Sequence, residues 1–148
     1  MPDHPPRIAL IIPTMRTTPI DTTALVAGQT LQPTAVIVVA GVSPNGRARN
    51  QGVAMLHAQE QASGQPAAEW LLFVDDDAQF GHPECIARLW QSLQQPGVAI
   101  AGAARLVPPD ATPFERAVAA QVARIENPVV AVDTITNPDP PHYQCNIT

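Results

Sequence analysis

The sequence contains no lysine, because all eight basic side chains among its 148 residues are arginine. Mechanisms that need a lysine, from the phosphate-binding P-loop to Schiff-base catalysis, are therefore excluded. Cysteine is scarce as well: Cys85 and Cys145 lie far apart and form no CxxC or Cys/His cluster with metal-ligand spacing. We expect both to be reduced thiols.

Positive charge and long apolar runs are also lacking. The formal net charge is −5, which argues against a general nucleic-acid-binding surface, since such a surface needs a basic stripe. No apolar run reaches the roughly 18 residues that span a bilayer. The Pro-rich start has no basic-then-apolar signal pattern. We therefore expect no nucleic-acid partner, no membrane span in this chain, and a cytoplasmic location, either for this chain or for the part that it forms of a larger protein.

What is present indicates one globular domain with a parallel sheet. Hydrophobic residues make up 45% of the chain, and a chain of this length buries about two thirds of its unfolded surface. Apolar runs predict strands that alternate with helical patterns, the arrangement of an α/β fold with helices on both faces of a mostly parallel sheet. The expected strands are 8–12, 35–40, 70–74 and 98–103. The expected helices are one that starts at residue 21 and ends near residue 28 or residues 32–33, one at 47–62, and one that starts at residue 83 and ends by residues 95–97.

One of these strands runs directly into three acids. The apolar run from Trp70 to Val74 is typical of a strand buried on both faces, and Asp75, Asp76 and Asp77 follow it. Two carboxylates about 4 Å apart repel by roughly 4 kcal/mol at an effective dielectric near 20. Solvent, a raised pKa or a hard cation such as Mg²⁺ or Mn²⁺ would offset that repulsion. The alternative is an acidic turn that only caps the next helix.

Two strand exits carry further polar groups. Pro13 is expected to end the strand at residues 8–12, so that Thr14 begins a loop at the carboxyl edge of the sheet. The helix at 47–62 is expected to carry Arg47, Arg49 and Asn50 in its first turn. Cations there oppose the helix dipole, and a bound phosphate would reverse that cost.

Three motifs in order resemble a known family. They are Ile11-Ile12-Pro13-Thr14 at a strand exit, Ala48-Arg49-Asn50-Gln51-Gly52 near a helix start, and Phe73-Val74-Asp75-Asp76-Asp77 at the end of a strand. Each is weak alone, but the ordered set is similar to the nucleotide-sugar-binding half of a family 2 glycosyltransferase, over roughly the first 105 residues. The resemblance implies a Rossmann-like GT-A fold.

The resemblance also implies roles for single residues. Asp77, with Asp75, would hold Mn²⁺ or Mg²⁺ in a DxD motif, and Asp75 would also contact the ribose. Arg49 would face the base or the phosphates. The nucleotide-sugar-binding residues expected in this way are Pro13, Thr14, Arg49, Asn50, Asp75 and Asp76.

The sequence departs from the family pattern at two places. Family members usually carry an acid after the second strand, where the base is recognised, but residues 40–43 contain no carboxylate. The family's general base would lie after residue 105, where no Glu-Asp pair occurs. We assign that role to none of the isolated acids there, namely Asp110, Glu115, Glu126, Asp133 and Asp139.

The domain organisation follows from these motifs. Residues 1–6 are expected to form a flexible Pro-rich arm and residues 7–107 the nucleotide-sugar-binding domain. Residues 108–148 would extend the same domain and stop before an acceptor-binding half, with a helix at 114–125, an edge strand at 129–135 and an extended turn at 137–141.

The expected function is inverting transfer of a sugar from a nucleoside-diphospho-sugar to an acceptor hydroxyl, with inversion implied by the resemblance. The isolated chain could instead be a non-catalytic or fragmentary binding module. A phosphoacceptor domain, such as a receiver, would suit the acids and the α/β pattern. The families that such a domain would resemble, however, use a lysine to neutralise the phosphoryl oxygens, and this chain has none.

Overall fold

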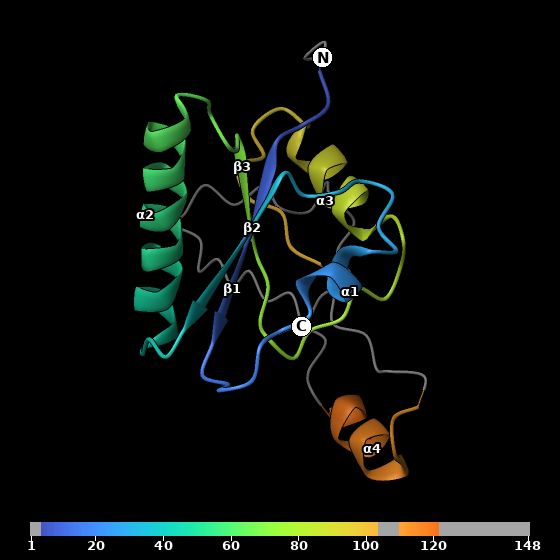
Figure 1. Ribbon diagram of the computed structural model, residues 1–148. Coiled ribbons are helices and arrows are strands. Elements are labelled where there is room, and N and C mark those ends of the chain that lie inside the picture. The colour runs from blue at the N-terminus through green and yellow to red at the C-terminus, as the bar shows by residue number, and fades with distance from the viewer. Residues whose placement is uncertain (1–3, 104–109, 122–148) are drawn as a thin grey trace.

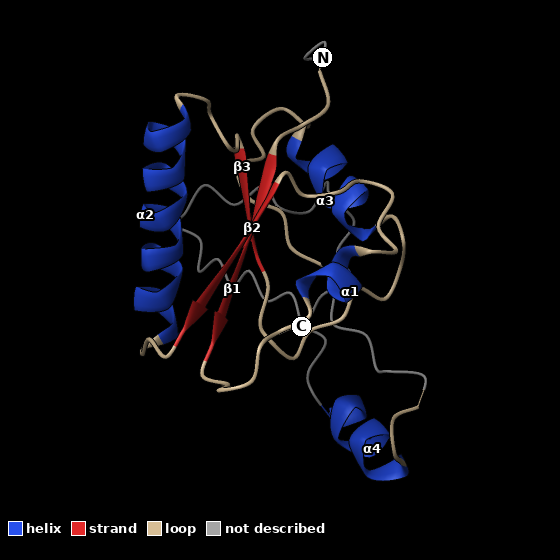
Figure 2. Cartoon of the chain, in the orientation of Figure 1, coloured by secondary structure: helices blue, strands red, loops and turns tan. Residues whose placement is uncertain are grey.

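The computed structural model describes residues 4–103 and 110–121, which form three strands and four helices. All strand pairs are parallel, and the order in the sheet is β2-β1-β3. The predicted α/β class is therefore confirmed (Figures 1 and 2). The elements are β1 (Ile8–Thr14), α1 (Thr22–Val26), β2 (Ala35–Ala40), α2 (Asn45–Ser63), β3 (Trp70–Phe73), α3 (Cys85–Leu93) and α4 (Pro113–Gln121).

Strand β1 is the centre of the core, and each of its residues is buried. Ile8, Leu10 and Ile12 point to one face, where they pack with residues of α1 and α3. Ala9 and Ile11 point to the other face and pack against α2. Figure 1 shows α2 on one side of the sheet and α1 and α3 on the other. Helices thus cover both faces, as the apolar runs predict.

Local signals explain where the helices begin. The Asp21 carboxylate accepts a hydrogen bond of 2.9 Å from the N–H of Ala24 and caps α1, as expected. Helix α3 begins at Cys85, two residues later than expected, and buries Ile86 against the sheet.

Cys85 is a free thiol. No helix in residues 4–103 and 110–121 is long and apolar enough to cross a membrane.

The prediction for the start of α2 is wrong by two residues. The helix begins at Asn45, after Pro44, so its first turn is residues 45–48. Arg49 and Asn50 consequently lie in the second turn. Pro44 is the N-cap residue of this helix. Proline suits the start of a helix because it has no backbone N–H that would need a hydrogen-bond partner there. The expected phosphate site at the helix N-terminus therefore loses part of its basis, because only Arg47 of the three expected residues lies in the first turn.

The expectation that Pro13 ends its strand is also wrong, because β1 continues to Thr14. The carbonyl of Ile11 accepts a hydrogen bond of 3.1 Å from the N–H of Val74. Odd-numbered residues of β1 therefore direct their backbone groups toward β3. Pro13 faces the same side, but the ladder with β3 ends at Ile11 and Phe73. The missing N–H of Pro13 thus breaks no hydrogen bond between strands.

Strand β3 is not buried on both faces, contrary to the prediction, and Leu71 is 43% exposed. Leu71 lies in register with Ala9, on the face that α2 covers. Helix α2 packs over β1 and β2 rather than β3. An apolar run indicates that a strand belongs to the sheet, but not how far the covering helix extends over it.

The fourth expected strand is absent, since residues 98–103 form no strand. Four of these six residues are alanine or glycine, which have low β-propensity and offer little side-chain area for packing. Ile100 is 44% exposed. The helix expected at 114–125 is confirmed over the described residues by α4, which lies away from the sheet in Figure 1. The rest of that helix, the strand at 129–135 and the turn at 137–141 lie outside the described residues.

Glu60 ties the last turns of α2 to the loop that leads into β3. Its carboxylate accepts hydrogen bonds from the N–H groups of Ala67, at 3.0 Å, and Ala68, at 3.4 Å. It also lies 2.9 Å from Nδ1 of His57. The hydrogen bond to the His57 side chain, followed by that to the Ala67 backbone, lowers the pKa of Glu60 below its usual value of 4.5.

This lowered pKa predicts a pH-dependent contribution to stability. Because the folded-state pKa lies below the unfolded one, the contribution is complete above about pH 5 and is lost as the pH falls through the folded-state pKa. Thermal unfolding of wild type and Glu60→Gln should therefore differ most near neutral pH, with wild type more stable. The difference should shrink below pH 4.5. A difference that does not change with pH would contradict the role of the carboxylate charge.

Candidate functional site

The carboxyl ends of β1 and β3 form the edge at which the polar residues gather. The chain leaves β1 toward β2 on one side, while β3 lies on the other side of β1. The crevice between the ends of β1 and β3 is thus a topological switch point, where open α/β sheets bind ligands. Thr14 ends β1, and the three acids follow β3.

Arg49 and Asp75 form the first contact across this edge. Nη2 of Arg49 donates to Oδ1 of Asp75 at 3.1 Å, and both side chains are between one quarter and one third exposed. The guanidinium also lies over the Phe73 ring, 5.7 Å from its centroid, a distance at which cation and ring attract each other. Helix α2 therefore places Arg49 beside the acidic turn, residues 75–77, a contact that the sequence motifs alone do not predict. The buried Nε of Arg49 has no hydrogen-bond partner among the described residues.

Thr14 and Asp76 form the second contact. The Thr14 hydroxyl donates to Oδ2 of Asp76 at 2.5 Å, and Thr14 is only 5% exposed. Nε of Arg16 lies 3.3 Å from the same oxygen, and the N–H of Arg16 donates to the Thr14 hydroxyl at 2.9 Å. The sequence-based prediction missed Arg16. The available signal was a cation two residues beyond a strand end, in a chain with few cations.

The other predicted residues have separate environments. Asp77 is exposed, and among the residues that the structure describes its carboxylate makes no hydrogen bond or ion pair. Pro13 is buried in β1, in register with Val39. Asn50 is exposed on α2, and one helical step turns it about 100° away from Arg49. The structure therefore brings Thr14, Arg49, Asp75 and Asp76 together, but not Asn50.

The carboxylates at this edge suit a divalent metal that is held partly by the protein and partly by substrate phosphates. Among residues 4–103 and 110–121, no group of three or more His, Cys, Asp or Glu side chains is arranged to bind a metal by itself. Mg²⁺, however, is commonly bound through one or two carboxylates together with substrate phosphates. Asp75 and Asp76 each face an arginine, which leaves the Asp77 carboxylate as the donor without a cationic partner in this part of the chain.

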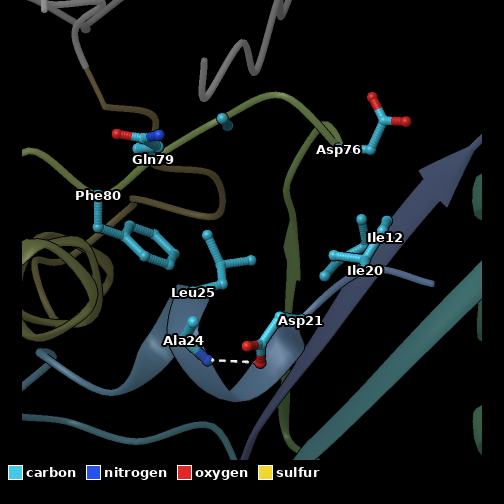
Figure 3. Close-up of a pocket in the computed structure, with 9 residues that line it drawn as sticks. Ile12, Ile20, Asp21, Ala24, Leu25, Asp76, Gln79 and Phe80 are labelled. Atoms are coloured by element: carbon cyan, nitrogen blue, oxygen red, sulfur yellow. Dashed lines mark hydrogen bonds between the residues drawn. The ribbon is translucent and has the colours of Figure 1, made fainter. Parts of the chain in front are cut away.

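A cavity of about 380 Å³ lies beside this turn, on the face that α1 covers. Its lining is mixed, with apolar residues of β1 and α1 on one side and the polar residues Asp21, Asp76 and Gln79 among the others. In the view of Figure 3, the Asp76 side chain lies at one end of the cavity and Phe80 at the other. The Asp21 carboxylate accepts its hydrogen bond from the N–H of Ala24. Asp76 thus pairs with Arg16 and also lines the cavity.

Comparison with known proteins decides the family. Residues 31–140 match the family model described as Glycosyl transferase family 2, which is most of the chain. The chain belongs to glycosyl transferase family 2. The match includes the helix that carries Arg49 and the acids after β3, but not β1 with Pro13 and Thr14. No curated protein and no solved structure matches the chain.

Family membership confirms the resemblance drawn from the three motifs, and the chain is a family 2 glycosyltransferase domain. Its three-stranded parallel sheet is consistent with the Rossmann-like GT-A fold. The family implies a sugar-donor substrate and typically uses a divalent metal. The match begins after β1 and extends to residue 140, whereas the motifs place the resemblance in roughly the first 105 residues.

Proposed function

We propose that this glycosyltransferase domain binds a nucleoside-diphospho-sugar at the carboxyl edge of β1 and β3, with Mn²⁺ or Mg²⁺ on Asp77. One observation carries the proposal. Of the three acids in the turn, two are paired with Arg49 and Arg16, so the third keeps a negative charge that no cation of the described residues balances. A metal that bridges this carboxylate and a diphosphate would balance it.

The other residues of the edge have complementary roles in this proposal. Arg49 offers a guanidinium, whose planar fork matches phosphate oxygens, and its unpartnered Nε gains a hydrogen bond when an acceptor reaches it. Asp75 orients Arg49 and contacts the ribose or shares the metal. Pro13 and Thr14 lie at the end of the central strand, next to the nucleotide. Asn50 is the weakest member, because it points away from Arg49.

The reaction proposed is sugar transfer with inversion at the anomeric carbon. The oxygen of an acceptor hydroxyl bonds to that carbon while the bond from the carbon to the diphosphate oxygen breaks. The metal, when bound, would neutralise the charge that develops on the departing diphosphate, and Arg49 would add a fixed positive charge beside it. Inversion rests on family membership. No general base is assigned.

Titration calorimetry with UDP- and GDP-sugars, in Mn²⁺ and in a metal chelator, tests the binding proposal. We expect saturable binding that is much tighter in Mn²⁺. Equal binding in chelator would contradict the role of the metal, and no binding of either sugar nucleotide would contradict the site.

The second candidate is a binding module that carries out no transfer. It is favoured by the absence of a Glu-Asp pair after residue 105 and of a carboxylate in residues 40–43. Donor-sugar hydrolysis and transfer should be measured for this chain and for any longer gene product. Activity of this chain supports the enzyme, whereas binding without turnover supports the module. The cytoplasmic location and the domain boundaries stay predictions from the sequence.

A further inference from the structure

Asp76 forms a closed set of contacts with the exit of β1. Its Oδ2 accepts the Thr14 hydroxyl, and the same oxygen faces Nε of Arg16 at 3.3 Å. The Thr14 hydroxyl in turn accepts the N–H of Arg16 at 2.9 Å. The Asp76 oxygen therefore contacts the side chain of Arg16 directly and its backbone through the Thr14 hydroxyl, although Thr14 and Asp76 are 62 positions apart in the sequence.

This arrangement leaves the two terminal nitrogens of the Arg16 guanidinium available. The closest approach to Asp76 is made by Nε, and neither terminal nitrogen of Arg16 donates a hydrogen bond to a residue that the structure describes. The Arg16 side chain is 51% exposed, against 23% for Asp76. A guanidinium fixed through Nε still has four N–H groups on its terminal nitrogens, which can bind an anion in a bidentate manner.

The three consecutive acids therefore have three different environments. Asp75 pairs with Arg49 from α2, Asp76 holds Arg16 from the loop after β1, and Asp77 is exposed. The two arginines approach the acidic turn from different segments, and each pairs with its own acid. Oδ2 of Asp76 already faces a hydroxyl and a guanidinium and would have to give up these partners to bind a metal, which disfavours this oxygen as a metal ligand.

We propose that Asp76 is a positioning residue, and that it presents Arg16 as a second guanidinium for the diphosphate of the donor. This deepens the function proposed above and rests on it. Asp76 acts through Arg16 and Thr14 rather than by touching the nucleotide. Arg16 and Arg49 then flank the diphosphate, and Asp77 remains for the metal. The assignment replaces the nucleotide-binding role that the sequence suggests for Asp76.

The test compares ligands with and without phosphates in the full chain. Binding of UDP and GDP in Mg²⁺ is measured by calorimetry, and the weaker binding of uridine and guanosine by NMR. The variants are Arg16→Gln, Asp76→Asn and the double substitution. Arg88→Gln is the matched control, because Arg88 pairs with Glu84 on the exposed face of α3. Thermal unfolding checks that each variant is folded.

Arg16→Gln should weaken diphosphate binding about tenfold, the usual scale of one lost charge-assisted hydrogen bond, and leave nucleoside binding unchanged. Asp76→Asn should weaken diphosphate binding less, and the double variant should match Arg16→Gln alone. Equal losses for diphosphate and nucleoside, or additive losses in the double variant, would show a merely structural role and overturn the inference. The inference would also be overturned if the variants bound the diphosphates as tightly as wild type does. Failure of wild type to bind either diphosphate would overturn the proposed function itself.

Discussion

Asp77→Asn is expected to weaken the binding of a UDP- or GDP-sugar in Mn²⁺ by at least about a hundredfold. Changes to the outer partners of metal ligands already cost ten- to a hundredfold, and the loss of a ligand should cost no less. Asparagine keeps the size and one oxygen of the side chain but removes its charge. The variant should fold normally, because Asp77 is exposed and makes no hydrogen bond within the described residues.

The control for this experiment is Asp110→Asn, which removes one exposed carboxylate outside the edge of the sheet. It should bind the donor as wild type does. In a metal chelator, wild type and Asp77→Asn should bind equally weakly, since the difference between them is the metal. If Asp77→Asn keeps the wild-type response to Mn²⁺, then Asp77 does not hold the metal.

The second large effect concerns the packing of α2. A Cβ on Gly52 would overlap the Cγ2 atom of Ile11 and lie 3.2 Å from Cγ2 of Val39. Ile11 is completely buried and Val39 nearly so, and both are β-branched, so neither side chain can move aside easily. Gly52→Ala should therefore destabilise the protein by about 1–3 kcal/mol. This holds even though alanine favours a helix over glycine by about 1 kcal/mol.

Gly46→Ala is the matched control, since it makes the same substitution in the same helix. A Cβ on Gly46 would meet no atom within 4 Å, so this variant should be as stable as wild type or slightly more stable. In a domain of this size, each kcal/mol corresponds to roughly 2–4 °C in Tm. Thermal unfolding of both variants checks the prediction. Equal Tm values would mean that Gly52 does not set the approach of α2 to the sheet.

Much of the fold could be predicted because β1, β2 and α2 have strong local signals. Continuous β-branched runs predict β1 and β2, and the long breaker-poor segment predicts α2. The errors arise where a distant neighbour decides the outcome. Strand β1 passes Pro13 because its pairing with β3 ends at Ile11, and Leu71 stays exposed because α2 lies over the other two strands. Neither relation can be derived from a local window of sequence.

The site was predictable in its members more than in their contacts. Adjacent acids after a strand are visible in the sequence, as is an arginine near a helix start. The pairing of Arg49 with Asp75, and of Arg16 with Asp76, depends on how α2 and the loop after β1 meet the acidic turn. A run of three aspartates looks uniform in the sequence. In the fold, Asp75 pairs with Arg49, Asp76 pairs with Arg16, and Asp77 is exposed.

The proposed diphosphate site lies where β1, α2 and the acidic turn meet. The most direct measurement is the change in backbone amide NMR shifts when UDP or GDP is added with Mg²⁺. We expect the largest changes at Thr14, Arg16, Arg49 and Asp77. Changes concentrated at the opposite edge of the sheet, where Arg7 pairs with Glu69, or no changes at the acidic turn, would contradict it.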